Sequence, residues 1–116
     1  MIDDLAKLLK AIAHPIRLKI LILCAQKEQT SRELREALNI SKPLLIAHLH
    51  KLTEAGFLEH RVEVDEKKMI IKKYYKTTNF TVHIDANFLK KIPINDKDTK
   101  STKIKGEDYT SPSDLK

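Results

Sequence analysis

The stretch TSRELREALNISKPLLIAHLHKLTEAG, from Thr30 to Gly56, decides the fold of this chain. Thr30 precedes Glu33 by three residues, and this capping-box spacing predicts the start of a short helix. Asn39 tolerates the left-handed conformation that ends such a helix, and Ser41 is a favoured cap for the next one. Gly56 is typical of a helix stop. The stretch therefore predicts two helices joined by a tight turn.

The apolar spacing within these two helices predicts which face of each is buried. The first helix carries its apolar residues three and four apart, and the second repeats leucine at the same spacing. Proline in the first turn of the second helix does little harm, because the amide that it lacks would be unpaired there anyway. The expected inner faces are Leu34, Ala37 and Leu38 in the first helix, and Leu45, Leu49 and Leu52 in the second.

Two further helices precede this stretch. Apolar residues recur at helical spacing over residues 2–13, which predicts an amphipathic helix. Pro15 ends that helix and opens another over residues 15–26. Because residues 15–26 are apolar nearly all round, we expect that helix at the centre of the domain. We expect a structural role for His14 at the junction, and a buried structural thiol for Cys24.

The segment after Gly56 alternates like a two-stranded hairpin. Val, Ile and Tyr predict strands over Phe57–Asp65 and Met69–Thr77, joined by a loop of three or four residues. We also expect a short strand over Phe80–Ile84 and a last helix over Ala86–Ile92. Two helices, a turn and a hairpin in this order predict a mainly α fold with a small β-hairpin, the winged helix-turn-helix.

Composition bounds the class of protein. A chain of 116 residues suits one domain, which we place at residues 1–92, followed by a polar and disordered tail at 93–116. The tail holds five Lys and five Asp or Glu, so the net charge of +6 falls on residues 1–92. A single cysteine excludes an internal disulfide framework. With neither a signal peptide nor a membrane span expected, we place the protein in the cytoplasm, associated with the nucleoid.

A basic helix-turn-helix predicts contact with double-stranded DNA through its second helix. Lysines there and at the hairpin tip can neutralise phosphates, while Ile46 and Ala47 can offer only apolar contact to bases. His48 is expected to one side of this face. The predicted DNA-binding residues are Arg32, Ser41, Lys42, Pro43, Ile46, Ala47, His50, Lys51, Arg61, Lys67, Lys68 and Lys72.

The predicted face is poor in groups that read bases, since it has no Arg, Asn or Gln for paired contacts. We therefore expect much of the affinity to come from phosphate contact and DNA shape. One interpretation is a dimeric regulator with specific sites. A second is an architectural, nucleoid-type binder with little sequence preference, and a third is a winged-helix module that docks another protein.

The segments AIAHPIRLKIL (Ala11–Leu21), ELREALNISKPLLIAHLHKLTEAGFLE (Glu33–Glu59) and YYKTT (Tyr74–Thr78) resemble the ArsR family of winged-helix repressors. The resemblance covers about residues 5–80. It implies transcriptional repression by a homodimer whose first and last helices pack across the two-fold axis. The dimer-interface residues implied in this way are Ile2, Leu5, Leu8, Leu9, Ile12, Phe88 and Leu89.

Many proteins of that family sense metals, but this sequence departs from both of the family's metal-site patterns. The helix before the second helix of the motif has no cysteine pair. His83 and Asp85 precede the last predicted helix without a second His or acidic partner. We therefore expect no metal effector and no cofactor. Without a glycine-rich phosphate loop or a serine elbow, we also expect no enzyme activity.

Overall fold

The computed structural model describes residues 2–94 of the chain. The chain divides into two compact units, each treated by itself below. One unit is Leu8–Thr81, and the other contains the chain up to Lys7 together with the chain from Val82 onward. The predicted tail lies outside the described residues from position 95 onward.

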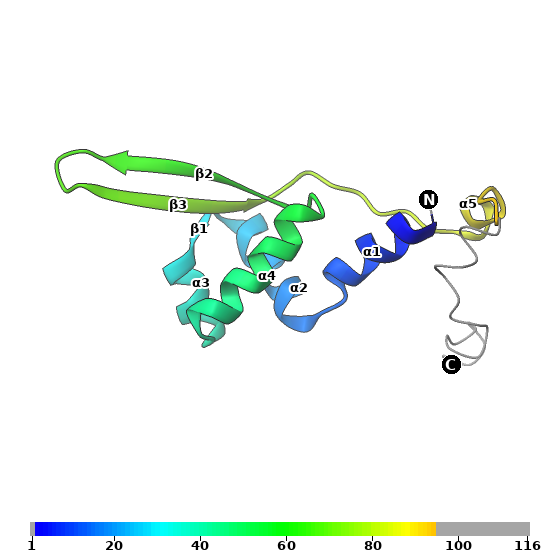
Figure 1. The fold of residues 1–116 in the computed structure, drawn as a ribbon, viewed down its shortest axis with the longest axis horizontal. Coiled ribbons are helices and arrows are strands. Elements are labelled where there is room, and N and C mark those ends of the chain that lie inside the picture. Colours follow the sequence, from blue (N-terminus) through cyan, green and yellow to red (C-terminus); the bar gives the residue numbers. More distant parts are fainter. Residues whose placement is uncertain (1, 95–116) are drawn as a thin grey trace. The chain divides into compact units, whose positions relative to one another are not determined.

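Five helices and three strands are formed by residues 2–94 (Figure 1). The helices of the motif predicted from the sequence are α3 and α4, and the predicted hairpin is formed by β2 and β3. The elements in chain order are α1 (Ile2–Ile12), α2 (Pro15–Gln26), β1 (Gln29–Thr30), α3 (Ser31–Leu38), α4 (Lys42–Glu54), β2 (Leu58–Asp65), β3 (Ile70–Thr77) and α5 (Ala86–Lys90).

The caps predicted for α3 are present. The Thr30 hydroxyl accepts the amide of Glu33 at 3.2 Å, and the Glu33 carboxylate accepts the amide of Thr30 at 2.9 Å. Asn39 ends α3 in the left-handed conformation, with φ at 54°. This residue changes the chain direction before Ser41, whose hydroxyl accepts the amide of Leu44 at 3.3 Å and starts α4.

Glycine at position 56 ends α4 as predicted. Its φ of 87° is in the left-handed region, which glycine adopts without a side-chain clash. The Gly56 amide donates to the Thr53 carbonyl at 3.1 Å, and the Phe57 amide donates to the Leu52 carbonyl at 3.0 Å. This pair of bonds is the Schellman arrangement, and it leads the chain directly into β2.

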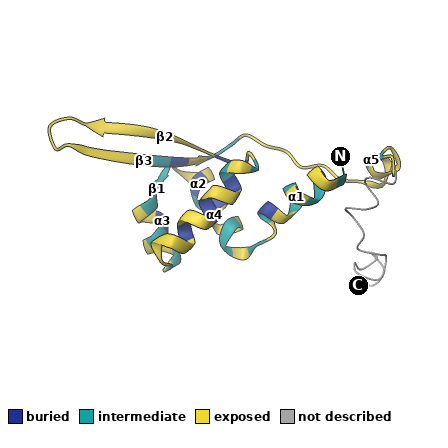
Figure 2. Ribbon diagram, in the orientation of Figure 1, coloured by how far each residue is buried: buried dark blue, intermediate teal, exposed yellow. Residues whose placement is uncertain are grey.

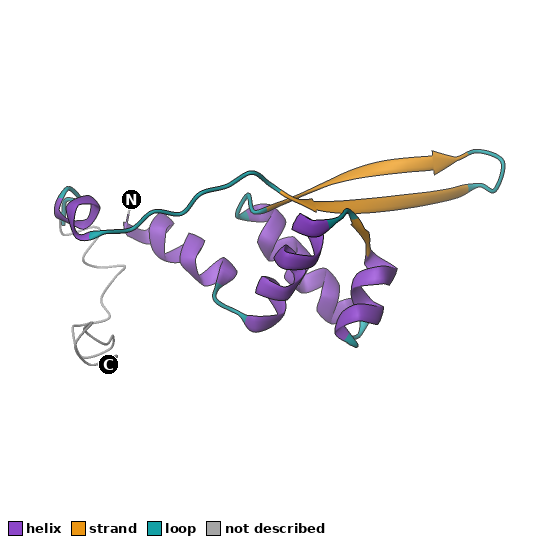
Figure 3. Cartoon of the chain, turned by 180° about the vertical axis from the view of Figure 1, so that it is seen from behind, coloured by secondary structure: helices purple, strands orange, loops and turns teal. Residues whose placement is uncertain are grey.

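The hairpin and β1 form one antiparallel sheet with the strand order β1-β3-β2. Leu58 lies opposite Thr77 and Asp65 opposite Ile70, so the two long strands pair over their whole length. Residues 66–69 form the connecting loop, which has the predicted length (Figure 3). Thr30, extended because it caps α3, pairs with Tyr74 on the free edge of β3.

The strand predicted at Phe80–Ile84 is wrong, because the structure has no strand there. The chain turns away from the sheet after β3, where Thr78 bonds the Phe57 carbonyl through its amide and the Gly56 carbonyl through its hydroxyl. The Phe80 ring then packs edge-on against the Phe57 ring, with centroids 4.6 Å apart. Phe80 therefore contacts the core as a single anchor rather than as part of a strand.

One core lies between α2, α3, α4 and the base of the hairpin. Its buried apolar residues are Ala11, Ile20, Leu21, Cys24, Leu34, Leu45, Leu49, Leu52, Phe57, Leu58 and Tyr75. Two details differ from the sequence predictions: Ala37 is exposed, and α2 is not buried on all sides. Leu18 and Ile22, one turn apart on α2, are 47% and 56% exposed, so this helix covers the core with one face only.

The last helix, α5, is shorter than predicted and ends at Lys90 rather than Ile92. Its predicted cap is present, since the Asp85 carboxylate accepts the Phe88 amide at 2.8 Å. The same carboxylate contacts the His83 ring at 2.9 Å, and these two contacts lower the pKa of Asp85.

Candidate nucleic-acid interface

Helix α4 has one buried and one open face (Figure 2). Leu45 and Leu52 are fully buried and Leu49 is 3% exposed, which fixes the rotation of the helix about its axis. The predicted DNA-facing residues of α4 are all exposed, and they are Lys42, Pro43, Ile46, Ala47, His50 and Lys51. The sequence therefore predicted correctly which side of α4 is open.

The charges on the open face of α4 are available to a ligand. No ion pair joins Lys42 or Lys51 to a carboxylate within residues 2–94. His50 lies 3.0 Å from the Glu54 carboxylate, one turn further along the same helix. The face thus carries an ammonium group at each end, neither paired with a carboxylate of residues 2–94, and an imidazole beside one of them. The apolar Ile46 and Ala47 lie between the two ends.

At the hairpin tip, the loop backbone is fixed by Asp65. Its carboxylate accepts the amides of Lys67 and Lys68 at 3.1 and 3.2 Å. Met69 closes the loop with a φ of 55° and is 87% exposed. The side chains of both lysines are exposed, so the tip presents two ammonium groups on an ordered turn.

Arg61, predicted to contact phosphate, is instead held by carboxylates. Its guanidinium donates two hydrogen bonds to Glu28, at 2.8 and 2.9 Å, and one to Glu63 at 2.7 Å. It also stacks on the Tyr74 ring, with the guanidinium carbon 4.5 Å from the ring centroid. These carboxylates raise the pKa of Arg61, and Arg61 lowers that of Glu28. We leave Arg61 out of the proposed DNA surface, because one cation with two carboxylates is not a free positive charge.

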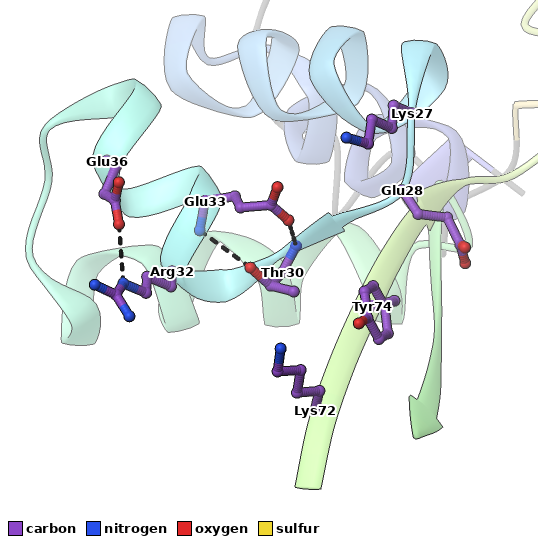
Figure 4. A pocket seen from close by; sticks show the side chains of 8 residues that line it. All are labelled: Lys27, Glu28, Thr30, Arg32, Glu33, Glu36, Lys72 and Tyr74. Carbon is purple, nitrogen blue, oxygen red and sulfur yellow. Dashed lines mark hydrogen bonds and ion pairs between the residues drawn. The ribbon is translucent and has the colours of Figure 1, made fainter. Parts of the chain in front are cut away.

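A groove of about 570 Å³ lies between the start of α3 and β3 (Figure 4). It brings together Arg32 and Lys72, two of the predicted phosphate contacts, and Figure 4 shows Lys72 pointing toward Thr30. Arg32 also pairs with Glu36 at 3.0 Å on the exposed side of α3. The groove is lined by Lys27, Glu28, Thr30, Arg32, Glu33, Glu36, Lys72 and Tyr74, whose three cations and three carboxylates balance.

Three residues form a polar cluster that the sequence did not predict, and of these His48 is buried while His14 and Arg17 are half-buried. His48, expected beside the DNA-facing surface, is only 6% exposed and points into the domain. Arg17 donates to His48 Nδ1 at 3.1 Å, and the His14 and His48 rings lie 4.6 Å apart. The predicted turn role of His14 is confirmed, since its Nδ1 accepts the Ile16 amide and caps α2. No periodic pattern connects positions 31 residues apart, so only the structure reveals the cluster.

Cys24 is buried as predicted. It is 1% exposed, and burial raises the pKa of its thiol to about 12. A thiol at this position is protonated at neutral pH and is a poor nucleophile. Among residues 2–94 there is also no group of three or more His, Cys, Asp or Glu side chains arranged to hold a metal ion. None of the helices in the described part of the chain is long and apolar enough to cross a lipid bilayer.

These elements define a winged helix-turn-helix protein, with α3 and α4 as the motif and the hairpin as the wing. Residues 14–60 match the family model described as bacterial regulatory protein, arsR family. The chain is 33% identical over 89 residues to an uncharacterized HTH-type transcriptional regulator, MJ0229 of Methanocaldococcus jannaschii, covering 77% of this chain and 92% of that one. The chain belongs to the ArsR family of DNA-binding transcriptional regulators.

Two solved structures and one repressor sequence support this assignment. The homodimeric winged helix-turn-helix domain Mb0332 of Mycobacterium bovis is 31% identical with a TM-score of 0.56, covering 65% of this chain and 64% of that one. The repressor BigR of Xylella fastidiosa is 28% identical, also at a TM-score of 0.56, over 67% and 71% of the two chains. A biofilm growth-associated repressor of Agrobacterium fabrum is 40% identical over 63 residues, 54% of each chain.

Proposed function

We propose that this regulator is a repressor that acts as a homodimer and inserts α4 into the major groove of its operator. The observation that carries the proposal is the open, lysine-bearing face of α4 on a helix held by three buried leucines. A helix fixed in this way presents one constant face to DNA. The proposed contact residues are Arg32, Ser41, Lys42, Pro43, Ile46, Ala47, His50, Lys51, Lys67, Lys68 and Lys72.

Within this surface, we assign phosphate contact to the lysines and base contact to the middle of α4. Lys42 and Lys51 lie at the two ends of the open face, and a groove-bound helix has phosphate backbones on both sides. Ile46 and Ala47 lie between them and suit thymine methyl groups. This division predicts an operator whose central contacts favour thymine and whose affinity depends strongly on salt.

A single-residue comparison tests the assignment to α4. Lys51→Ala removes a charge from the proposed surface, whereas Lys19→Ala removes one from an exposed position on α2. We expect Lys51→Ala to reduce the salt slope of DNA binding by about 0.9, and Lys19→Ala to leave it unchanged. Equal slopes for the two variants would overturn the placement of α4 on DNA.

The degree of sequence preference decides between two functions. Ile46 and Ala47 have no polar side-chain groups that read bases. Their place in the middle of the open face therefore keeps open the alternative of an architectural binder with little sequence preference. In vitro selection of bound duplexes, followed by footprinting, gives the best site. A specific regulator is expected to prefer that site over random duplex by about a thousandfold or more. Equal affinity for the selected site and for random duplex would overturn the repressor and favour the architectural binder.

The homodimer is proposed from the apolar side of α1 and from the homodimeric neighbour Mb0332. Two of the predicted interface residues, Leu8 and Ile12, pack against the core of their own chain, so we leave them out of the proposed interface. Leu5 and Leu9, one turn apart on α1, are half-buried, and we keep them in the proposed interface. Phe88 is also half-buried and Leu89 is 52% exposed, so both stay in the proposed interface.

Charge in the proposed α1 interface tests the dimer. Leu5→Asp with Leu9→Asp buries two carboxylates in the interface and is expected to give a monomer by light scattering. The matched control is Val64→Asp on the wing, which lies outside α1 and α5 and is expected to leave the dimer intact. A dimeric double variant would show that another surface mediates assembly, and a monomeric wild type would overturn the homodimer.

A further inference from the structure

Arg17 joins two helices that the sequence separates. Its Nε donates to His48 Nδ1 at 3.1 Å, on the inner side of α4. Its Nη1 donates to the carbonyls of Lys10 and Ala11 at 3.3 and 3.2 Å, in the last turn of α1. The Lys10 carbonyl also accepts the Ala13 amide at 3.3 Å, so the guanidinium adds a side-chain donor to the carbonyls at the end of α1. One side chain thus connects the end of α1 to the middle of the DNA-facing helix.

The bond from Arg17 fixes the protonation state of His48. Arginine keeps its protons at all ordinary pH values and can only donate, so His48 Nδ1 must carry a lone pair. His48 is therefore neutral, with its proton on Nε2. That Nε2 atom is buried and has no hydrogen-bond partner within residues 2–94. A second proton would have to be placed on Nδ1, where it would remove the acceptor and face the guanidinium.

The surroundings oppose such a proton from each element packed on this side of α4. His14, at the junction of α1 and α2, and Arg17, on α2, are the two groups whose charge acts on His48. Burial is the largest cause that lowers the pKa of His48, followed by His14 and then Arg17. No carboxylate bonds to the His48 ring in the described part of the chain, so nothing there would stabilise an imidazolium.

We propose that Arg17 and His48 are positioning residues for α4, and that the packing of α4 on the rest of the domain requires a neutral His48. Protonation of His48 breaks the bond to Arg17 and places a buried cation beside the half-buried guanidinium. Helix α4 then loses its link to α1, and DNA affinity falls. The inference rests on the proposed function for its DNA measurement, but its structural part can be tested without DNA.

The need for a neutral His48 sets the direction of the pH effect on DNA binding. DNA binding that needs neutral His48 weakens as pH falls through the lowered pKa of that residue, by up to about tenfold per pH unit. A positive charge added to the open face of α4 would instead strengthen binding to phosphate, so the direction of the change separates the inner face of α4 from its open face.

The test compares DNA affinity between about pH 8 and about pH 5 for the full chain and two variants. His48→Asn keeps an oxygen near the place of Nδ1 as an acceptor for Arg17, but it cannot be protonated. The matched control is His60→Asn, an exposed position on β2. We expect the affinity of wild type and of His60→Asn to fall in acid by a larger factor than that of His48→Asn, whose loss stays below about threefold. Circular dichroism at both pH values confirms that each protein stays folded.

Equal acid losses in wild type and His48→Asn, or no loss in wild type, would overturn the inference. If wild type binds no duplex at any pH, the proposed function fails, and the structural part is decided by nuclear magnetic resonance. An Nε2–H tautomer for His48, with α4 amide shifts that follow its titration, supports the link to α4. An Nδ1–H tautomer, or α4 amides that do not respond, overturns it.

Discussion

Helix α4 and the β2–β3 hairpin are both proposed to contact DNA, but the protein holds them in different ways. Every turn of α4 after the first places a side chain in the core, and its buried residues Leu45, His48, Leu49 and Leu52 hold it in one orientation. The hairpin is buried at its base, by Leu58 and Tyr75, while residues 59–73 are all exposed (Figure 2). The difference suggests that α4 supplies the fixed shape, while the wing mainly supplies charge.

The outer part of the wing keeps the two-faced pattern of a strand pair without a core beneath it. Val64 lies opposite Ile71 in the ladder, and these residues are 59% and 71% exposed. On the other face, Glu63 lies opposite Lys72, next to the Arg61 cluster. Cross-strand pairs of this kind contribute about 0.2–1 kcal/mol each, far less than a buried leucine.

Truncation of one side chain in each region is the strongest test of this contrast. We expect Leu52→Ala to reduce the free energy of unfolding by about 2–5 kcal/mol, because it leaves a cavity in the core. Val64→Ala removes fewer atoms from a half-exposed position, and we expect a loss of less than about 1 kcal/mol. Urea unfolding followed by circular dichroism measures both. Similar losses would mean that the wing is covered in solution by a surface outside this chain.

Helix α4 could be predicted almost completely from the sequence. Its cap, its proline, its leucine spacing and its glycine stop are all local, and each acts within one or two turns. The same is true of the hairpin, whose strands and loop length are set by neighbouring residues. The predicted strand at Phe80–Ile84 was wrong because a strand depends on a free partner edge. β1 pairs with the free side of β3 near Tyr74 instead, and Phe80 is held by Phe57.

Charge removal at the wing tip is expected to have the next largest effect. Lys67→Ala with Lys68→Ala removes two exposed ammonium groups and is predicted to reduce the salt slope of DNA binding by about 1.8. Affinity for all sequences is then expected to fall alike, since phosphates carry no base information. Titrations at several salt concentrations, on the selected site and on random duplex, measure this change. An unchanged slope would remove the wing from the DNA surface.

The candidate site was predicted less well than the fold, for reasons of distance. Periodicity shows which residues of α4 are exposed, but it does not show which cations are already paired. Arg61 is held by Glu28, 33 positions earlier in the chain, and Arg17 bonds His48 across 31 positions. Both contacts depend on how α2, β2 and α4 pack, and that packing leaves no periodic signal in one sequence.

Loss of the Thr30 cap of α3 is expected to reduce the free energy of unfolding by less than the truncation of Leu52. Thr30→Ala removes the oxygen that accepts the Glu33 amide, and caps of this type contribute about 1 kcal/mol. Bonds from Thr30 lower the pKa of Glu33, so its ionised form stabilises the fold above its unfolded pKa, and this contribution is lost as pH falls through the folded pKa. In Thr30→Ala we expect the pKa of Glu33 to rise only part of the way to its ordinary value, because the amide of residue 30, the largest cause of the lowering, still donates to the carboxylate. Carboxyl shifts in a magnetic resonance titration measure this change.

The smallest expected effects come from glycine substitutions at two turns, one between α3 and α4 and one at the tip of the wing. Asn39 and Met69 both have left-handed backbones, with φ at 54° and 55°. Asparagine tolerates this conformation, whereas a long apolar side chain is strained there. Met69→Gly is therefore expected to stabilise the fold by about 0.5 kcal/mol, because the relief of strain exceeds the added freedom of the unfolded chain.

Asn39→Gly gives the matched comparison, and here the balance reverses. Little strain is relieved at Asn39, so the added freedom of the unfolded chain dominates, and we expect a loss of about 0.5 kcal/mol. The two variants remove a side chain from the same backbone conformation, so the opposite signs come from the residues replaced. Urea unfolding of both variants against wild type measures the signs. A lower free energy of unfolding in Met69→Gly would mean that the Met69 side chain makes a stabilising contact despite its exposure. The wing tip would then contribute to stability as well as supply charge.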